Sequence, residues 1–177
     1  MISKEYYHKC VKNEQYKGIE KDNLSFIDKL WAHFFRPQTN AIIHLRKMQY
    51  WHGRFEILSK LHSVVLNRRY GMYINPEAQI EEGLYFPHPT GICMTNVRIG
   101  KDFTCLQNCT IGSKKLGMTK VPETPNIGNN VTMYANSMII RKVHVADGVI
   151  IGSGSCLLKD ADMAGGVYCG SPAHLVK

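Results

Sequence analysis

His88 is the residue of this sequence best placed to do chemistry, because it lies between Pro87 and Pro89 at what the two prolines predict to be a turn. A neutral imidazole has an ordinary pKa of about 6.5, so it can accept a proton from a group that is hardly ionised at neutral pH, such as an alcohol. The position therefore predicts general-base activation of a hydroxyl group. The alternative is a solvated turn histidine with no chemical role.

The elements that would position His88 are set by a six-residue period. Every sixth residue is apolar through twelve positions, although hydrophobic residues make up 44% of the chain, so the pattern is not accidental. These marker positions are Ile99, Cys105, Ile111, Ile127, Met133, Ile139, Val145, Ile151, Leu157, Met163, Cys169 and Leu175. A fixed period of six is typical of a parallel β-helix, in which each short strand and turn must stack on neighbouring coils to bury its apolar face.

The period continues upstream and has one large interruption. The upstream markers are Ile74, Ile80, Phe86 and Ile92. The seven-residue step from Ile92 to Ile99 indicates a one-residue bulge. Ten extra residues are looped out between Ile111 and Ile127. We therefore expect a mainly β fold, with one β-helical domain over residues 72–177 and an inserted loop at about 114–124.

Residues 1–71 lack this period and show helical patterns instead. Asp22, with Ser25 behind it, can cap a helix that stops near Pro37. A second, long helical stretch follows and ends at Gly71. We therefore expect an α-helical N-terminal segment in front of the β-helix.

The positive charge of the chain is concentrated in the predicted helices. Residues 1–71 contain 13 Lys and Arg against 6 Asp and Glu, a net charge of +7, whereas residues 72–177 contain 9 against 8. Nucleic-acid binding is a poor explanation, because the basic residues follow helical faces without a recognised binding motif. The sequence has no run of eighteen apolar residues and no apolar segment behind its N-terminal charges, so we expect neither a membrane span nor a secretory signal, and a cytoplasmic protein.

The six cysteines do not form a metal-binding pattern. Cys105 and Cys109 have a CxxxC spacing, but no second ligand pair follows, so we expect no metal site. Cys105 and Cys169 fall on marker positions, and Cys109 lies two residues before a marker, where small residues recur. These positions are typical of small core residues in a reducing compartment.

Several stretches of the predicted β-helix together resemble one enzyme family. They are GLYFPHPTGI at 83–92, LQNCTIG at 106–112, PNIGNNVTM at 125–133, GVIIGSGSCLLKD at 148–160 and CGSPAHLVK at 169–177. In this order they are similar to the serine acetyltransferase branch of the hexapeptide-repeat acyltransferases. They resemble still more the O-acetyltransferases encoded with capsule and exopolysaccharide genes. The resemblance covers about residues 70–177 and implies a left-handed parallel β-helix, a homotrimer with active sites between subunits, and acetyl-CoA as the donor.

The same resemblance implies roles for individual residues. His88 takes the place of the family's catalytic histidine and would act as the general base. In the donor site, small residues would let the pantetheine arm of CoA approach the strand backbone, and lysines would meet its phosphates. The implied donor-site residues are Gly112, Ala135, Ser153, Lys159, Ser171, Pro172 and Lys177.

The acceptor side departs from the serine-specific pattern. Tyr73 stands where the family has an Asp that orients the histidine, and Pro87 stands where an Asp helps to hold the amino acid. Glu123 and Thr124 replace an Arg-His pair that binds the substrate carboxylate, and a Glu there would repel that group. We therefore expect a neutral sugar hydroxyl as the acceptor. The predicted acceptor-binding residues are Tyr73, Tyr85, Gln107, Glu123 and Thr124, although Tyr73 can equally be a packing residue.

The function predicted from these residues is acetyl-CoA-dependent O-acetylation of a sugar hydroxyl in the synthesis of a bacterial surface polysaccharide such as capsule, exopolysaccharide or lipopolysaccharide. One alternative is a serine O-acetyltransferase of cysteine biosynthesis with a divergent acceptor pocket. Another is a non-acylating hexapeptide protein, either a scaffold or a metal-dependent trimer. A metal-dependent trimer would need three convergent histidines, and His88, His144 and His174 are too unevenly placed for that.

The helical segment can also bring the protein to the inner face of the cytoplasmic membrane. Its net charge of +7 would attract anionic lipids, and large aromatic rings favour the membrane interface. The aromatic residues concerned are Trp31, Phe34, Phe35 and Trp51. The alternative is that these apolar side chains pack within the assembly while the basic residues are merely solvated.

Overall fold

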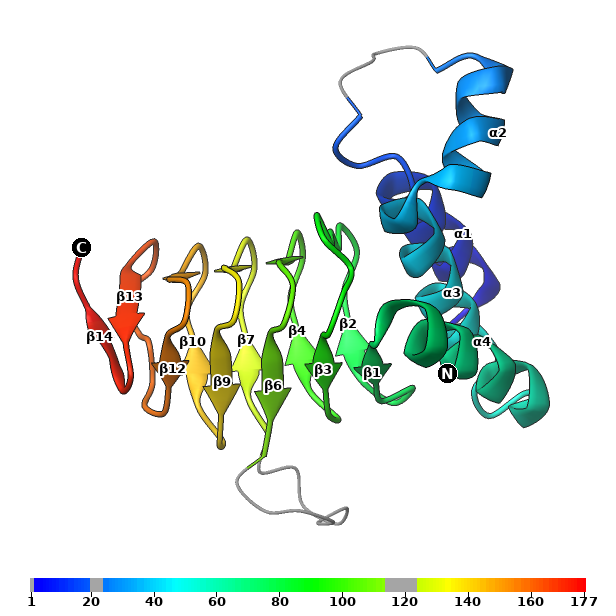
Figure 1. Cartoon of the computed structure of the whole chain (residues 1–177). Coiled ribbons are helices and arrows are strands. Elements are labelled where there is room, and N and C mark those ends of the chain that lie inside the picture. The colour runs from blue at the N-terminus through cyan, green and yellow to red at the C-terminus, as the bar shows by residue number, and fades with distance from the viewer. Residues whose placement is uncertain (1, 20–23, 114–123) are drawn as a thin grey trace.

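The chain forms a helical cap at one end of a long β-helix, as shown by a computed structural model that describes residues 2–19, 24–113 and 124–177 (Figure 1). The helices are α1 (Lys4–Glu14), α2 (Phe26–Phe35), α3 (Pro37–Trp51) and α4 (Glu56–Tyr70). The strands are β1 (Tyr73–Ile74), β2 (Gln79–Ile80), β3 (Cys93–Met94), β4 (Arg98–Ile99), β5 (Thr104–Cys105), β6 (Thr110–Gly112), β7 (Asn126–Ile127), β8 (Thr132–Met133), β9 (Met138–Ile140), β10 (His144–Val145), β11 (Ile150–Ile151), β12 (Cys156–Leu157), β13 (Val167–Gly170) and β14 (Ala173–Leu175). None of the described helices is long and apolar enough to cross a membrane.

Three sheets wrap around one apolar core, which confirms the predicted parallel β-helix. Their strand orders are β1-β3-β6-β9-β12, β10-β7-β4-β2 and β14-β13-β11-β8-β5, and all pairings are parallel except that of β13 with β14. Markers of successive coils lie in register, as Ile111 does with Ile139 and Ile127 with Val145. These four side chains are at most 2% exposed, so each hexad buries its marker against the coils above and below.

The corners of the coils explain why polar and glycine residues recur between the markers. Asn108, Asn130 and Asn136 have positive φ angles between 56° and 61°, a conformation that asparagine tolerates better than most residues. At Gly128 a Cβ atom would lie only 2.3 Å from Asp147 Oδ1 and 3.0 Å from the carbonyl oxygen of Val145. The residue after this marker must therefore be glycine, because the next coil passes too close for a side chain.

The predicted period is wrong at one upstream position. Met94, not Ile92, occupies the marker position, since Met94 pairs in register with Ile74 and Ile111. Eight residues separate Phe86 from Met94, two more than a hexad. The extra residues of this coil thus lie in the segment that carries His88, and they let that segment leave the regular corner.

The period also ends earlier than predicted. Met163 and Leu175 are 53% and 47% exposed, so they are not core markers. Three hexads would place the partner of Ile151 eighteen residues further on, at Cys169, but Ile151 pairs with Tyr168 at seventeen residues. Tyr168 is therefore the buried residue at this position instead of Cys169. Because β14 then turns back antiparallel to β13, no further coil forms.

The helices differ from the predicted pattern in two respects. The long stretch that ends at Gly71 consists of two helices, because the chain turns between them at Gly53, where φ is 76°. An additional helix, α1, precedes the predicted ones. Ser25 caps α2 and exchanges hydrogen bonds with Asp28, and Gly71 ends α4 in a left-handed conformation with φ of 62°.

The helical cap is joined to the β-helix by a buried arginine. Arg46 of α3 is fully buried, and all five of its N–H groups donate hydrogen bonds. Two go to the carboxylate of Glu14, at 2.9 and 2.6 Å, and the others go to Gln49 Oε1 and to the carbonyl oxygens of Ile80 and Glu81. Burial by itself lowers the pKa of the Arg46 guanidinium, but the hydrogen bond and charge of Glu14 outweigh it and raise that pKa. Arg46 therefore remains charged in the interior.

Glu14 extends this network to the coil that leads to His88. Its Oε1 atom also accepts hydrogen bonds from the backbone N–H groups of Gly83 and Leu84, at 2.9 and 3.1 Å. Gln49 donates to the carbonyl oxygen of Ala78 at 2.9 Å. One buried network thus fixes α1 and α3 against the first coil of the β-helix.

Glu14→Ala should lower the free energy of unfolding by about 3–5 kcal/mol, because it leaves a buried guanidinium without its counter-charge. Lys9→Ala is the matched control, since Lys9 lies on the same helix and its side chain is 59% exposed where it pairs with Glu82 at 2.8 Å. That exposed pair should contribute little. Denaturant unfolding of the two variants measures the difference, and equal stability of both would show that the buried network does not hold the cap.

Candidate active site

His88 lies on an exposed edge of the β-helix. It is in the corner where the chain leaves the sheet that contains β5. The backbone of Tyr85 bridges Thr104 of β5, so the segment after Tyr85 stacks on the segment after β5. Further along, the N–H of Asn108 donates to the carbonyl oxygen of Thr90 at 2.9 Å. The side chain of His88 is exposed, so its imidazole is open to a substrate at this edge.

Five of the other predicted site residues lie at the equivalent corners of successive coils. The N–H of Asn136 donates to the carbonyl oxygen of Gln107 at 3.1 Å, and that of Gly154 to the carbonyl oxygen of Ala135 at 2.9 Å, which stacks these corners in one column. The residues in this column are Gln107, Ala135, Ser153, Ser171 and Pro172. With about 4.8 Å between neighbouring strands, the column forms a continuous edge that begins at His88.

Other predicted residues lie away from this column. Gly112 ends β6 and Lys159 follows β12, and these two strands belong to one sheet. Both residues therefore lie at the corner where the chain leaves that sheet, which is the corner after the one that forms the column. Tyr73 opens β1 in the same sheet and is 58% exposed. Lys177 is exposed at the C-terminal end, where its carbonyl oxygen accepts a hydrogen bond from Val167.

Thr124 is the residue of the predicted acceptor loop that the structure describes, and it is half-buried just before β7. Glu123 and the rest of the inserted loop at about 114–124 lie outside the described residues.

Gln107 carries an unsatisfied acceptor close to His88. Its Oε1 atom is buried and has no hydrogen-bond partner among the described parts of the chain. Buried polar atoms without a partner are rare in native proteins, because such an atom costs about 1–3 kcal/mol. Gln107 lies one corner from His88, and this oxygen would accept a hydrogen bond from a bound molecule once its side chain turns outward.

The helical cap holds the His88 segment directly, which the sequence pattern did not reveal. Gln38 of α3 donates from Nε2 to the carbonyl oxygen of Pro87 at 2.8 Å. Within the segment, the N–H of Thr90 donates to the carbonyl oxygen of His88 at 2.8 Å. Gln38 is 49 residues away in sequence, and no spacing rule connects a helix N-terminus to a β-helix corner.

The chain after α1 also crosses over the coil that carries His88. Lys17 Nζ hydrogen-bonds the carbonyl oxygen of Gly83 and pairs with Asp102 Oδ1 at 3.0 Å. Gly18 has a φ of 79°, and a Cβ atom there would lie 2.2 Å from the hydroxyl oxygen of Tyr85. The Tyr85 hydroxyl is therefore covered by backbone, and only glycine fits above it.

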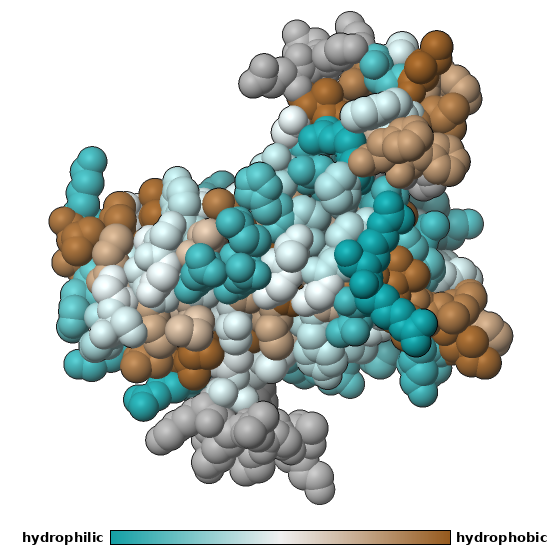
Figure 2. Space-filling model, viewed as in Figure 1, coloured by the Kyte–Doolittle hydropathy of each residue, from teal (hydrophilic) through white to brown (hydrophobic). Residues whose placement is uncertain are grey.

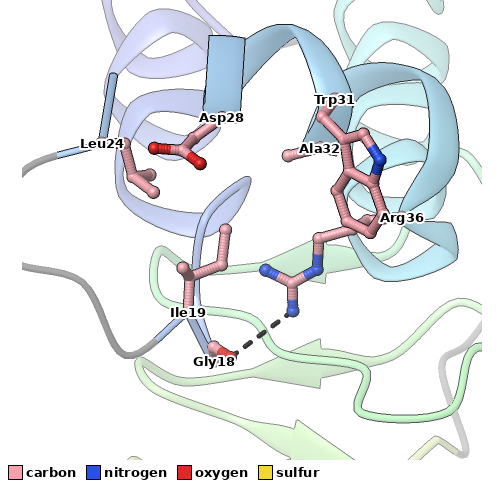
Figure 3. A pocket seen from close by; sticks show the side chains of 7 residues that line it. All are labelled: Gly18, Ile19, Leu24, Asp28, Trp31, Ala32 and Arg36. Atoms are coloured by element: carbon pink, nitrogen blue, oxygen red, sulfur yellow. Dashed lines mark hydrogen bonds between the residues drawn. The ribbon is translucent and has the colours of Figure 1, made fainter. Parts of the chain in front are cut away.

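A cavity of about 400 Å³ lies beside this crossing, between α2 and the chain after α1 (Figure 3). Its lining residues are Gly18, Ile19, Leu24, Asp28, Trp31, Ala32 and Arg36. Arg36 Nη2 reaches the carbonyl oxygen of Gly18 at 3.5 Å across it. His88 does not line this cavity, and its side chain is exposed at the edge of the described chain.

Comparisons with known proteins place the chain near one enzyme family, although no family model matches it. A curated serine acetyltransferase of Staphylococcus xylosus is 30% identical over 135 residues, which cover 76% of this chain and 61% of that protein. One of Helicobacter pylori is 28% identical over 142 residues, 79% of this chain and 81% of that protein. The chain thus spans about three fifths of the length of the staphylococcal relative.

Solved structures of the same kind share the fold. Neisseria gonorrhoeae serine acetyltransferase superposes with a TM-score of 0.83 at 24% identity, over 99% of this chain and 68% of that one. A serine acetyltransferase solved as a complex with CoA gives a TM-score of 0.79 at 22% identity, over 98% and 71%. These matches confirm the predicted left-handed parallel β-helix with a helical N-terminal segment.

The prediction of a sugar hydroxyl as the acceptor is wrong. The relatives and solved structures described above are serine acetyltransferases, and two such structures, from Neisseria gonorrhoeae and soybean, are complexes with serine. They do not support a closer relation to capsule or exopolysaccharide O-acetyltransferases. The prediction rested on the replaced positions Tyr73, Pro87, Glu123 and Thr124. The loss of charged groups shows only that a carboxylate would not be held in the same way, and it supplies no group that specifically recognises a sugar.

Gln38→Met should loosen the His88 segment without unfolding the protein, because it removes one donor while keeping the length of the side chain. The loss of a hydrogen bond worth about 1 kcal/mol predicts roughly five-fold faster amide hydrogen exchange over residues 87–91. Gln79→Met on the exposed side of β2 is the control and should leave that exchange unchanged. Unchanged exchange in Gln38→Met would mean that the cap does not position His88.

Proposed function

We propose that this protein is an acetyl-CoA-dependent serine O-acetyltransferase in which His88 is the general base. The observation that carries the proposal is the exposed His88 imidazole at the head of the corner column, in a chain whose matching relatives are serine acetyltransferases. The imidazole would take the proton of the serine hydroxyl as its oxygen attacks the thioester carbonyl. The C–S bond then breaks, and the CoA sulfur leaves with the proton that His88 returns.

The column of small residues supports acetyl-CoA as the donor. Ala135 and Ser153 at successive corners leave the strand backbone accessible to an extended pantetheine arm. Lys159 and Lys177 are exposed and would lie within reach of the CoA phosphates in an assembly that brings them to the same groove. A related enzyme was solved with CoA, which supports the same donor here.

The acceptor side would recognise serine through a different set of groups from those of the family. Tyr73, Pro87 and Thr124 supply no charge for the carboxylate. Gln107 Oε1 is a buried acceptor without a partner in the described chain, and an ammonium group is a donor that suits it. We therefore place the serine ammonium next to Gln107 and its hydroxyl next to His88.

The active unit would be a homotrimer with the site between subunits. The open edge at His88 supports this arrangement, because a neighbouring subunit would close it. On α4 the exposed side chains of Ile57, Leu61 and Val64 follow the i, i+4, i+7 spacing of one helix face, which suits packing against another copy.

His88→Asn should reduce turnover by at least the ~10²-fold typical of losing a general base, while thermal stability and CoA binding stay unchanged. His144→Asn, an exposed histidine on β10, is the matched control and should retain full activity. Release of CoA thiol in the presence of serine measures both variants. Retention of more than about a tenth of the activity in His88→Asn would exclude the general-base role.

The purified protein should form O-acetylserine from acetyl-CoA and L-serine with a kcat/KM of at least ~10⁴ M⁻¹s⁻¹, within the ordinary range for a true substrate. L-alanine is the control, because it keeps both charged groups of serine and lacks the hydroxyl. Mass spectrometry identifies the product. If no O-acetylserine forms above the non-enzymatic rate, serine is not the acceptor.

A further inference from the structure

Tyr134 is a large, exposed side chain beside the column of small residues that begins at His88. Most of the exposed large hydrophobic side chains of the described chain belong to the helical cap, and Figure 2 shows apolar side chains gathered over α2. On the β-helix, Tyr134 directly precedes Ala135 of the column and is 43% exposed. The donor site proposed above does not account for this ring.

The residues that follow the markers at this corner differ in size along the column. Leu106, Tyr134 and Gly152 lie on successive coils, because the markers before them pair in register. At Gly152 a Cβ atom would lie 2.5 Å from Cys169 Sγ, so that position has no room for a side chain. The Tyr134 ring therefore borders on bare backbone at its side away from His88, and it forms a step in the column.

The backbone of Tyr134 is fixed from both neighbouring coils. Its N–H donates to the carbonyl oxygen of Ile151 at 2.9 Å. Its carbonyl oxygen accepts hydrogen bonds from the N–H of Ser137 and from the thiol of Cys109, each at 3.2 Å. A tyrosine on a fixed backbone has few torsions left to order, so the free-energy cost of ordering it against a ligand is low.

We propose that Tyr134 is a specificity residue for the donor and packs its ring against the pantetheine arm of acetyl-CoA. The inference rests on the proposed function, in which the thioester lies at His88 and the arm follows the column. Tyr134 is two coils from His88, which at about 4.8 Å per coil places it roughly 10 Å along that path. The ring would cover methylene groups of the arm, and the phenol O–H would donate to one of its amide carbonyls.

The position of Tyr134 favours the arm over the other parts of the two substrates. In the proposed function serine lies between His88 and Gln107, and Tyr134 is one coil beyond Gln107. The phosphates of CoA bind most strongly to cationic groups, and an uncharged ring supplies none. The arm is the uncharged part of the donor, with both apolar surface and amides, and a tyrosine matches both.

Isothermal titration calorimetry with the full-length protein tests this assignment. The probes are CoA and adenosine 3′,5′-bisphosphate, which keeps the nucleotide and lacks the arm. Tyr134→Ala should bind CoA at least about ten-fold more weakly, because the buried ring contact is lost, and the bisphosphate about equally well. Tyr134→Phe keeps the ring and should bind CoA roughly five-fold more weakly, as expected for one lost hydrogen bond.

Phe55→Ala is the matched control, because Phe55 is an aromatic residue of the cap with 53% exposure, and it should bind both probes as the parent does. Unchanged CoA binding in Tyr134→Ala, or equal weakening of both probes, would overturn the inference and leave CoA as the donor. If the parent protein binds no CoA, the proposed function fails together with the inference.

Two further measurements separate the remaining explanations. A smaller sedimentation coefficient of Tyr134→Ala would assign the ring to a contact between subunits and overturn the inference. Where the parent transfers acetyl groups, Tyr134→Ala should raise the KM for acetyl-CoA at least about ten-fold and leave the KM for serine unchanged. If the parent binds CoA but forms no O-acetylserine, the acceptor is wrong and the inference stands, because the titration needs no acetyl transfer.

Discussion

The ion pair of Arg46 and Glu14 is the interaction on which the rest of the structure depends. A β-helix leaves the backbone of its first coil open, and here Arg46 occupies the carbonyl oxygens of Ile80 and Glu81 at that end. Burying a guanidinium is tolerable only when every donor finds a partner, and this one uses all five. The helical cap is therefore fixed in one position on the coil that leads to His88.

That fixed cap gives the candidate site its geometry. The β-helix aligns the small residues at its corners in a column, because each residue of one coil must stack on its counterpart in the next coil. The head of the column breaks the repeat, because the coil between Phe86 and Met94 is two residues longer than a hexad. Gln38 holds this longer segment at Pro87, and the chain around Gly18 covers Tyr85 just before it, so an irregular turn can present an imidazole at a defined place.

The cap presents two apolar surfaces with different surroundings. The exposed side chains of α4, such as Leu61, form a narrow stripe on one face of that helix, which suits contact between subunits. The face of α2 is wider, more aromatic and further from the β-helix.

The sequence by itself determined the β-helix, because burial in a repeated coil imposes an apolar residue at every sixth position. It also singled out His88 as the candidate base, through the prolines beside it and the motif around it. It did not determine the acceptor, since the missing charges around Tyr73 and Pro87 exclude one mode of binding without specifying another. Only the tertiary structure revealed the contact of Gln38 with Pro87 and the pairing of Arg46 with Glu14. Such contacts join residues far apart in the chain through packing of helices on coils, and no local period or spacing records them.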